Sequence, residues 1–412
     1  MRSIQTNQKI KFITKNRMPI LAALACFYLT PLPSFAKQMQ NDDLQTIVQK
    51  PSIPAISQQP KIQMAILLDT SSSMDGLIDQ TRNQIWSVVN EFSTATKNGE
   101  TPILEVALFE YGNDGNSKEV GHVRKLNSFT RELDRVSEGL FSLTTRGGSE
   151  YCGYVIKEAI TELQWSQSNN DIKTIFIAGN EAFTQGPVHY KDAIKLAEQK
   201  GIAVNTIFAG NFNSGVSAGW EVGAHLAGGD YMSIDANRQV VHIDAPQDSE
   251  IARLNSQLNQ TYIPYGSMGQ ESRKRQLEQD RTNGSISSGL LAKRAKSKSS
   301  SFYNNSSWDL VDALRDGKVK EADLADLNKE QLPQEMKEMS ADERKQHIQK
   351  QAKVRSELKR EITRLGKSRE QFVAKKKKEQ ALANDAPSVS DALSNAVRKQ
   401  AKQKGFKLEH KG

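Results

Sequence analysis

Three oxygen-bearing side chains with alternate spacing follow one apolar run of this 412-residue sequence. Asp69, Ser71 and Ser73 come directly after the largely apolar residues 62–68. One carboxylate and two hydroxyls make an all-oxygen set, which is the kind of ligand set that hard divalent cations prefer. We therefore expect a cation site here. The alternative is an ordinary polar loop, because serine and aspartate are also common helix caps.

The short run 62–68 predicts a buried strand, because apolar runs of this length are typical of sheets that are covered on both faces. A helical pattern follows the serines. Its apolar positions are Leu77, Ile78, Ile85, Trp86, Val89 and Phe92. In open α/β sheets ligands bind at the carboxyl ends of the strands. The order of strand and helix therefore puts the three side chains where a ligand would bind.

The spacing Asp-x-Ser-x-Ser after an apolar strand resembles the metal-ion-dependent adhesion site of von Willebrand factor type A domains. The resemblance extends from about Lys61 to about Gly266, and the chain looks similar to secreted bacterial proteins that carry this domain at their N-terminal side. It implies a doubly wound α/β fold, with a mostly parallel sheet flanked by helices. It also implies protein binding that depends on Mg²⁺, with Mn²⁺ or Ca²⁺ as alternative ions.

The glycine-containing stretch 144–153 is expected to form a second loop at the same edge of the sheet. The resemblance implies that Ser149 occupies the position at which the family has a threonine whose hydroxyl binds the cation. Glu150 could contribute a carboxylate instead. The paired glycines Gly147 and Gly148 allow a close backbone approach or a positive φ. An ordinary helix entry with Ser149 as N-cap is the competing interpretation.

The run 172–178 predicts another buried strand that ends in polar residues. The family pattern puts an aspartate just after this strand, and by register that place falls on Gly179. Asn180 or Glu181 would then have to supply the missing oxygen, directly or through water. The full set of cation ligands implied by the resemblance is Asp69, Ser71, Ser73, Ser149 and Glu181.

The rest of the domain is expected to alternate between strands and helices, with one antiparallel edge strand at about 119–126. Further strands are expected at about 104–111, 203–208 and 231–234. Helices are expected at about 75–95, 130–142, 154–163, 190–200, 218–226 and 248–261.

Residues 1–36 have the three parts of a secretory signal peptide. They hold five basic residues and no acidic one, an apolar stretch at 18–32, and a small-x-small cleavage site that ends at Ala36. We expect cleavage after Ala36 and export to the periplasm or the extracellular space, with a polar linker over 37–60. A retained N-terminal anchor and a lipidated Cys26 are the alternatives.

Charge is divided unevenly along the chain. Residues 271–412 carry 33 basic and 21 acidic side chains, whereas residues 37–270 are net negative. This asymmetry indicates that the basic tail contacts either an anionic surface or the acidic head itself. Residues 267–301 are basic and serine-rich, which predicts a solvated linker. We therefore expect the domain over 61–266 to fold without the tail.

Residues 302–412 are expected to be a charged α-helical region. Trp308 and its apolar neighbours begin a helical segment that can dock, and Ser340 with Glu343 forms a capping box before a long helix. Two heptad seams follow in this helix: Ile348, Arg355, Ile362 and Arg369, and Gln351, Leu358, Leu365 and Phe372. Arginine and glutamine weaken a coiled-coil seam. We therefore favour helices packed on a neighbour over an independent coiled coil.

Cysteine and histidine offer little chemistry. Only Cys152 remains once the signal peptide is removed, which excludes an intrachain disulfide. We interpret Cys152 as a small buried apolar side chain. The six histidines are scattered and show no zinc-type spacing with cysteine.

Three functions compete on these observations. The favoured one is an exported binding protein without enzymatic activity, whose cation is completed by an acidic side chain of a protein partner. The second is an envelope scaffold that binds anionic surfaces through its basic tail. The few aromatic residues of the tail argue against specific nucleic-acid binding. The third is metal-assisted hydrolysis, for which His189 is the nearest candidate base in the sequence.

Overall fold

The computed structural model of the protein describes residues 59–75, 78, 88–89, 91–92, 95–234, 243–381 and 389–408. The predicted signal peptide and residues 37–58 of the predicted linker lie outside this part of the chain. Within the helix expected after residue 75, the described residues 78, 88–89 and 91–92 are helical. No helix in the described ranges is both long enough and apolar enough to cross a membrane.

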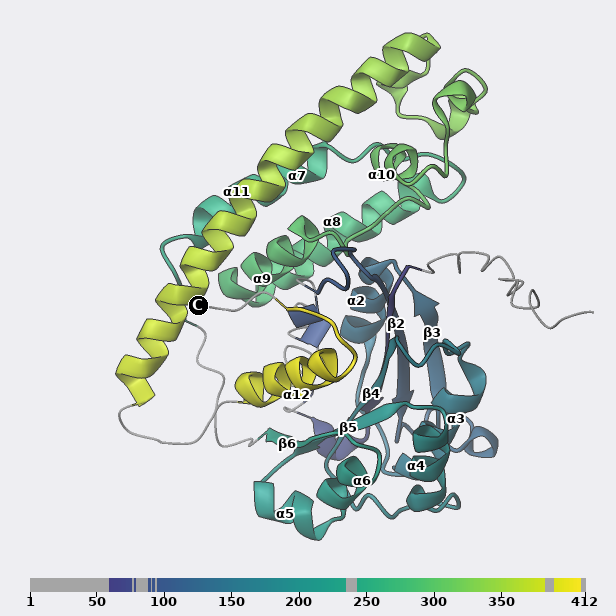
Figure 1. Ribbon diagram of the computed structural model, residues 1–412, viewed down its shortest axis with the longest axis vertical. Coiled ribbons are helices and arrows are strands. Elements are labelled where there is room, and N and C mark those ends of the chain that lie inside the picture. Colours follow the sequence, from purple (N-terminus) through teal and green to yellow (C-terminus); the bar gives the residue numbers. More distant parts are fainter. Residues whose placement is uncertain are drawn as a thin grey trace, which may run out of the picture. The chain divides into compact units, whose positions relative to one another are not determined.

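Six strands form one sheet in the spatial order β3-β2-β1-β4-β5-β6 (Figure 1). The strands are β1 (Lys61–Asp69), β2 (Ile103–Tyr111), β3 (Arg124–Thr130), β4 (Ile172–Gly179), β5 (Ala203–Ala209) and β6 (Tyr231–Ile234). Every neighbouring pair is parallel except β2 and β3, which run antiparallel. The predicted doubly wound, mostly parallel α/β fold is confirmed, and so is its antiparallel edge strand.

Glycines with positive φ displace two of the expected boundaries. The edge strand begins later than expected, because the short 3-10 helix η2 (Lys118–Val120) comes first and ends at Gly121, where φ is 65°. The helix expected at about 218–226 begins at Trp220 as α6 (Trp220–Leu226), because Gly219 with a φ of 90° comes before it, and a separate short helix, α5 (Phe212–Ser217), precedes that glycine. Glycine adopts such angles without the steric penalty of a side chain, and the apolar pattern gives no sign of them.

Both faces of the sheet are covered, which explains why its central strands read as apolar runs. All residues of β4 are buried, and so are those of β1 after Lys61. One face packs on α3 (Cys152–Glu162), α4 (Tyr190–Gln199) and α6. The other face packs on Val88, Val89 and Phe92, and on α2 (Leu133–Ser142), α7 (Asp248–Gln260) and α12 (Val389–Gln403).

The stretch 267–301 is not a linker, contrary to the expectation from its composition. It forms two consecutive helices, α8 (Gly269–Ile286) and α9 (Ser288–Ser299). Ser287 caps the second helix, because its Oγ accepts a hydrogen bond from the backbone N–H of Leu290 at 3.0 Å. Many of the buried side chains on these helices are polar or charged, including Gln276, Asp280 and Arg294. The polar composition of this stretch therefore predicted a solvated linker, although many of its polar side chains are buried.

The predicted long charged helix is α11 (Ala341–Ala381), which runs beside α7 and α9 (Figure 1). Its capping box is confirmed: the Ser340 N–H donates to Glu343 Oε2 at 2.8 Å, and the Glu343 N–H donates to Ser340 Oγ at 3.3 Å. The first predicted seam is buried at all four positions, Ile348, Arg355, Ile362 and Arg369. Within the described part of the chain, α11 packs on helices of its own chain, as favoured over an independent coiled coil.

The segment before α11 forms a small cluster of its own. It contains α10 (Leu310–Arg315) and the 3-10 helices η3 (Glu321–Leu324), η4 (Lys329–Gln331) and η5 (Gln334–Met336). Their apolar side chains pack with Ile348 of α11 and with Ile263. The docking expected of the segment at Trp308 is therefore confirmed, since Trp308 and Leu310 are both buried.

Helices beyond residue 266 belong to the same hydrophobic core as the sheet. The cluster that contains Ile66 and Leu68 of β1 also contains Ala295, Trp308 and Ile362. A domain cut after residue 266 would expose the apolar surface that these side chains cover. On this arrangement we now expect that the domain over 61–266 needs its tail to fold, in place of the expectation from composition.

The basic tail contacts the acidic head, which is one of the two outcomes that the charge asymmetry indicated. Ion pairs among the described residues join them, for example Arg294 with Asp134 at 2.8 Å, Arg398 with Glu91 at 2.7 Å, and Lys399 with Asp230 at 2.6 Å. The tail charge is thus partly used inside the molecule.

Candidate metal centre

Loops from four parts of the chain meet at the carboxyl edge of the sheet. β1 and β4 are neighbours there. Because β1 continues to β2 on one side and β4 to β5 on the other, this is the place where the strand order reverses. Ligands of doubly wound sheets bind at such a point. The predicted cation ligands therefore lie at the edge that the topology favours for a site.

The first loop brings Asp69, Ser71 and Ser73 together as predicted. Asp69 Oδ1 accepts a hydrogen bond from the Ser71 N–H at 2.8 Å. The Oγ atoms of Ser71 and Ser73 are 2.9 Å apart, and Ser73 Oγ donates to Asn180 Oδ1 at 3.0 Å. Asp69 and Ser71 are fully buried, whereas Ser73 is exposed on the 3-10 helix η1 (Ser72–Met74). The hydroxyls therefore lead from a buried carboxylate to solvent.

The first loop is held in place by the second. The Ser72 N–H donates to the carbonyl of Gly147 at 2.9 Å, and the Gly147 N–H donates to Ser72 Oγ at 2.9 Å. The Arg146 N–H donates to the carbonyl of Thr70 at 2.9 Å. Gly147 has a φ of 87°, and a Cβ there would lie 2.2 Å from Cγ of Asp114. The expected use of Gly147 for positive φ and close approach is therefore confirmed.

Gly112, the first residue after β2, brings the second loop beside Asp69. It forms an antiparallel bridge with Ser149. A Cβ on Gly112 would lie 2.5 Å from Asp69 Oδ1 and 3.0 Å from Glu150 Cγ. The absence of a side chain here lets both acids approach the same place. Ser149 is not the N-cap of α3, because Tyr151 occupies that position.

Asp69 and Glu150 are buried carboxylates that form no ion pair with a described residue. Among the described residues, Asp69 Oδ2 and Glu150 Oε2 have no hydrogen-bond partner. Burial raises the pKa of Asp69 to about 7, and burial together with the charge of Asp69 raises the pKa of Glu150 to about 8. Leaving two such oxygens unpaired is costly. A divalent cation fits this donor set, because it would satisfy both oxygens and compensate their charge.

The third loop departs from the family pattern for a steric reason. A Cβ on Gly179 would lie 2.4 Å from Tyr111 Oη and 3.0 Å from Trp220 Cη2. Tyr111 is fixed in this place, because its hydroxyl donates to the carbonyl of Ala178 at 3.0 Å. An aspartate therefore does not fit at position 179. The sequence pattern missed Tyr111 and Trp220, which lie far from the motif along the chain.

Glu181 lies exposed at the rim of the site. Its carbonyl accepts a hydrogen bond from Trp220 Nε1 at 2.7 Å. Its negative charge adds to the burial that raises the pKa values of Asp69 and Glu150. In this loop it is the side chain of Asn180, and not that of Glu181, that accepts the hydrogen bond from Ser73.

Cys152 lies beneath the site as a buried free thiol. Its Sγ is 3.6 Å from Tyr111 Oη. Burial raises the pKa of the thiol well above its usual range, so the sulfur stays protonated and unreactive. The structure agrees with the interpretation of Cys152 as a small buried side chain.

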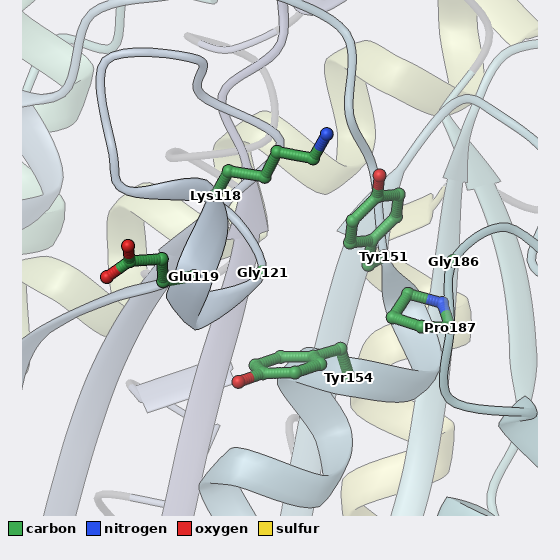
Figure 2. A pocket seen from close by; sticks show the side chains of 7 residues that line it. All are labelled: Lys118, Glu119, Gly121, Tyr151, Tyr154, Gly186 and Pro187. Atoms are coloured by element: carbon green, nitrogen blue, oxygen red, sulfur yellow. The ribbon is translucent and has the colours of Figure 1, made fainter. Parts of the chain in front are cut away.

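A shallow pocket adjoins the second loop (Figure 2). It has a volume of about 450 Å³ and is lined by Lys118, Glu119, Gly121, Tyr151, Tyr154, Gly186 and Pro187. Gly121 and Gly186 give space to the two tyrosine rings, since a Cβ on either glycine would lie within 2.7 Å of a ring atom. Tyr151 follows Glu150 directly, so one loop contributes both to the pocket and to the carboxylate pair.

The described ranges contain no group of three or more histidine, cysteine, aspartate and glutamate side chains that could hold a metal ion. A cation at the sheet edge would therefore depend on hydroxyls as well as carboxylates. Oxygen ligands of this kind suit Mg²⁺, Mn²⁺ or Ca²⁺ better than softer metals.

Residues 63–215 match the family model of the von Willebrand factor type A domain. No curated protein matches the sequence. The solved structures that resemble it include proximal thread matrix protein 1 from the mussel byssus with a zinc-occupied MIDAS motif, at 12% identity and a TM-score of 0.33, covering 44% of this chain and 43% of that chain. This chain therefore spans less than half the length of the mussel protein.

Two bacterial structures are similar at the same level. The pilus adhesin SpaC from Lactobacillus rhamnosus GG has 12% identity and a TM-score of 0.33, with 44% of this chain and 28% of that chain covered. BatB from Bacteroides thetaiotaomicron has 16% identity and a TM-score of 0.32, with 42% and 90% covered. By the match to the family model and by the strand order, residues 63–215 form a von Willebrand factor type A domain.

Proposed function

We propose that this domain binds a protein partner through a divalent cation held at the carboxyl edge of the sheet. One observation carries the proposal: Asp69 and Glu150 are buried beside the Ser71 and Ser73 hydroxyls, and each carboxylate has an oxygen without a partner among the described residues. A protein interior rarely leaves such groups unsatisfied unless a ligand completes them. Mg²⁺ is the proposed ion, with Mn²⁺ and Ca²⁺ as alternatives.

The proposed ligands combine buried and exposed groups. Asp69 and Ser71 would hold the ion from the buried side, Ser73 and Ser149 would add hydroxyls, and Glu181 would act from the rim. Mg²⁺ keeps some of its coordination positions for water when few protein groups bind it. An acidic side chain of the partner would replace such a water, because Ser73 is exposed and the ion would be reached from there.

A role in binding, without catalysis, is part of the proposal. His189 was the nearest candidate base in the sequence, but its Nδ1 accepts the backbone N–H of Lys191 at 3.3 Å at the start of α4. Its ring also stacks on Tyr190, with ring centroids 5.3 Å apart. A histidine used in this way supports a capping role.

Export remains part of the proposal and has its support in the sequence alone. Residues 1–36 have the composition of a signal peptide that is cleaved after Ala36. A binding domain in the periplasm or outside the cell would meet its partner there. N-terminal sequencing of the protein from an envelope fraction should give Lys37 as the first residue, whereas an intact Met1 in cytoplasmic material would contradict export.

The basic tail supports a second candidate function, contact with an anionic envelope surface. Lys375 and Lys378 are exposed near the end of α11. In contrast, Arg294, Lys298 and Arg355 are buried in ion pairs within the chain, which leaves fewer tail charges for a surface. Binding of this kind weakens steeply with salt, and chelation of divalent ions would leave it unchanged.

Calorimetry with Mg²⁺ and Mn²⁺ tests the leading proposal. Wild-type protein freed of metal by a chelator should bind one divalent ion, and Asp69→Ala should bind none. Asp75→Ala is the matched control, because Asp75 is an exposed acid of the same loop whose Oδ1 accepts a hydrogen bond from Thr145 Oγ1 at 3.3 Å. Equal binding by wild type and Asp69→Ala, or no binding by either at millimolar ion, would contradict the proposal.

Partner binding needs a separate experiment. The wild-type protein should retain specific proteins from an envelope extract in Mg²⁺ and release them in chelator, and Asp69→Ala should retain none of them. If the retained proteins stay bound in chelator but are released in high salt, the anionic-surface function is favoured instead.

A further inference from the structure

We infer that Glu150 supplies the second carboxylate of this cation site, in the role that an aspartate at position 179 has in the family pattern. The inference rests on the proposed function. Both carboxylates that bind the ion would then come from the loop after β1 and the loop before α3. The third loop, which follows β4, would supply no carboxylate that binds the ion directly.

Position 179 is closed to any side chain. Tyr111 Oη, Trp220 Cη2 and Asp69 Oδ2 all lie within 3.1 Å of the place where a Cβ would stand. Real Cβ atoms essentially never come as close as 2.4 Å to another heavy atom, which is the distance to the tyrosine oxygen. Tyr111 and Trp220 are both fully buried and hydrogen-bonded, so neither can move aside cheaply.

Glu150 is placed where the missing carboxylate is needed. Its side chain and that of Asp69 both approach Gly112 closely, because a Cβ there would touch both. Only 2% of the Glu150 surface is exposed, and its Oε2 has no hydrogen-bond partner among the described residues. The bridge between Gly112 and Ser149 fixes the backbone that carries Glu150. A buried acid that is held rigidly and left incomplete is what a ligand position requires.

The alternatives in the third loop are already engaged or exposed. Asn180 Oδ1 accepts the hydrogen bond from Ser73 at 3.0 Å. Glu181 is exposed, and its carbonyl is fixed by Trp220 so that the loop turns at this residue. An exposed carboxylate is already solvated by water, so it needs charge compensation by a cation less than a buried carboxylate does. Asn180 would thus orient Ser73, and Glu181 would act only at the rim.

The test compares two isosteric substitutions of neighbouring acids, Glu150→Gln and Glu181→Gln. Binding of Mn²⁺ alone is measured by calorimetry, and the bound ion is counted by electron paramagnetic resonance. We expect Glu150→Gln to weaken Mn²⁺ binding by more than about tenfold, and Glu181→Gln to change it by less than about twofold, by the scale of losses seen when groups around a metal are removed.

Two controls separate the outcomes. The melting temperature of metal-free Glu150→Gln should equal or exceed that of wild type, which shows that lost binding does not come from lost folding. Glu150→Asp keeps the charge but withdraws it by one methylene, and should bind more weakly than wild type and more tightly than Glu150→Gln. If Glu181→Gln loses the ion while Glu150→Gln keeps it, the inference is overturned and the proposed function stands. If wild type itself binds no Mn²⁺, the proposed function fails.

Discussion

Buried carboxylates occur in two regions of this molecule, and the two regions treat them in opposite ways. Between α7, α8 and α9, Asp280 accepts hydrogen bonds from Arg294 at 2.6 Å and Lys298 at 2.8 Å. At the carboxyl edge of the sheet, Asp69 and Glu150 form no ion pair with the residues that the structure describes, and each keeps an unpaired oxygen. The pKa values follow this difference. Burial opposes ionisation of Asp280, but the charges of Lys298 and Arg294 outweigh it and hold the pKa well below the usual range, whereas the pKa values of Asp69 and Glu150 are raised.

The comparison separates a structural use of buried charge from a functional one. A buried acid with a complementary base is complete, and removing either partner leaves an uncompensated charge. A buried acid without a partner is incomplete as it stands and is expected at sites that receive a ligand. The interface between tail and head is therefore complete in the structure, whereas the sheet edge is the place where we propose that an ion binds.

A second network repeats the structural pattern along α11. Arg355 donates to Asp309 at 2.6 Å and to Asp312 at 3.1 Å, and its guanidinium lies 4.0 Å from the centre of the Tyr262 ring. Arg369 pairs with Asp248 of α7 at 2.5 Å. The two arginines that weakened the coiled-coil interpretation are the residues that attach α11 to its own chain.

The largest effect should follow from removal of the tail. A chain ended at Gly266 loses the buried side chains of α9, α11 and α12 from the core of the sheet. We expect it to lose cooperative thermal unfolding, as followed by circular dichroism and calorimetry. A fragment that melts in one sharp transition at the temperature of the full chain would show that the tail is an accessory.

Arg294→Met should be the most damaging single substitution among those compared. It leaves Asp134 and Asp280 buried without their shared partner, which typically costs about 3–5 kcal/mol of unfolding free energy. Urea unfolding measures the loss. Arg253→Met is the control, because Arg253 pairs with Glu250 at the surface, and its unfolding curve should overlay that of wild type. If the unfolding curves of both variants overlay that of wild type, the buried ion pairs of Arg294 do not stabilise the fold.

The pH dependence of the two regions should have opposite signs. Asp69 and Glu150 have raised pKa values in the folded protein, about 7 and about 8. The folded state then binds more protons than the unfolded state, so the stabilisation from their neutral forms is complete below pH about 4 and is lost as the pH rises through about 7 to 8. Asp280 has a lowered pKa, so its contribution is present above its usual range and is lost on acidification.

Unfolding free energies of wild type and Asp69→Asn, measured in chelator between pH about 5 and about 9, test this sign. Wild type should lose stability from neutral to alkaline pH, and Asp69→Asn should lose less. An unchanged or rising stability of metal-free wild type over this range would contradict the description of Asp69 and Glu150 as unpaired.

The smallest effects should come from two neighbouring hydroxyls with different roles. Ser73 contacts Ser71 and Asn180, whereas Ser72 accepts the Gly147 N–H and holds the loop. Ser73→Ala should weaken Mg²⁺ binding by about tenfold and leave metal-free stability unchanged. Ser72→Ala should lower metal-free stability by about 1 kcal/mol. Calorimetry measures the Mg²⁺ affinity of both variants, and urea unfolding measures their metal-free stability. If Ser72→Ala lost affinity and Ser73→Ala lost stability instead, the roles given to the two hydroxyls would be wrong.

Much of the fold was predictable because its signals are local. The apolar runs of β1 and β4 and the capping box at Ser340 each depend on neighbouring residues, and each appears where it was expected. The failure at 267–301 has a different cause. Its buried charged side chains form ion pairs with residues that are distant in the sequence, such as Arg294 with Asp134. Composition gives no information about such pairs.

The site shows the same division between local and distant information. Asp69, Ser71 and Ser73 are brought together by one loop, so their spacing sufficed. The choice between Glu150 and Glu181 could not be made from the motif. It depends on the space around Gly179, which Tyr111 and Trp220 fill from other strands and helices.

The most direct test of the central claim is the melting temperature of the metal-free protein before and after addition of millimolar Mg²⁺ at pH about 8, for wild type and Asp69→Ala. An ion that binds only the folded state at about 100 times its Kd adds about 2.7 kcal/mol. The account predicts a clear rise for wild type and none for Asp69→Ala, whose metal-free melting temperature should be no lower than that of wild type. If Mg²⁺ leaves the wild-type melting temperature unchanged and calorimetry detects no heat of binding, the claim that the unpaired carboxylates bind a cation is contradicted.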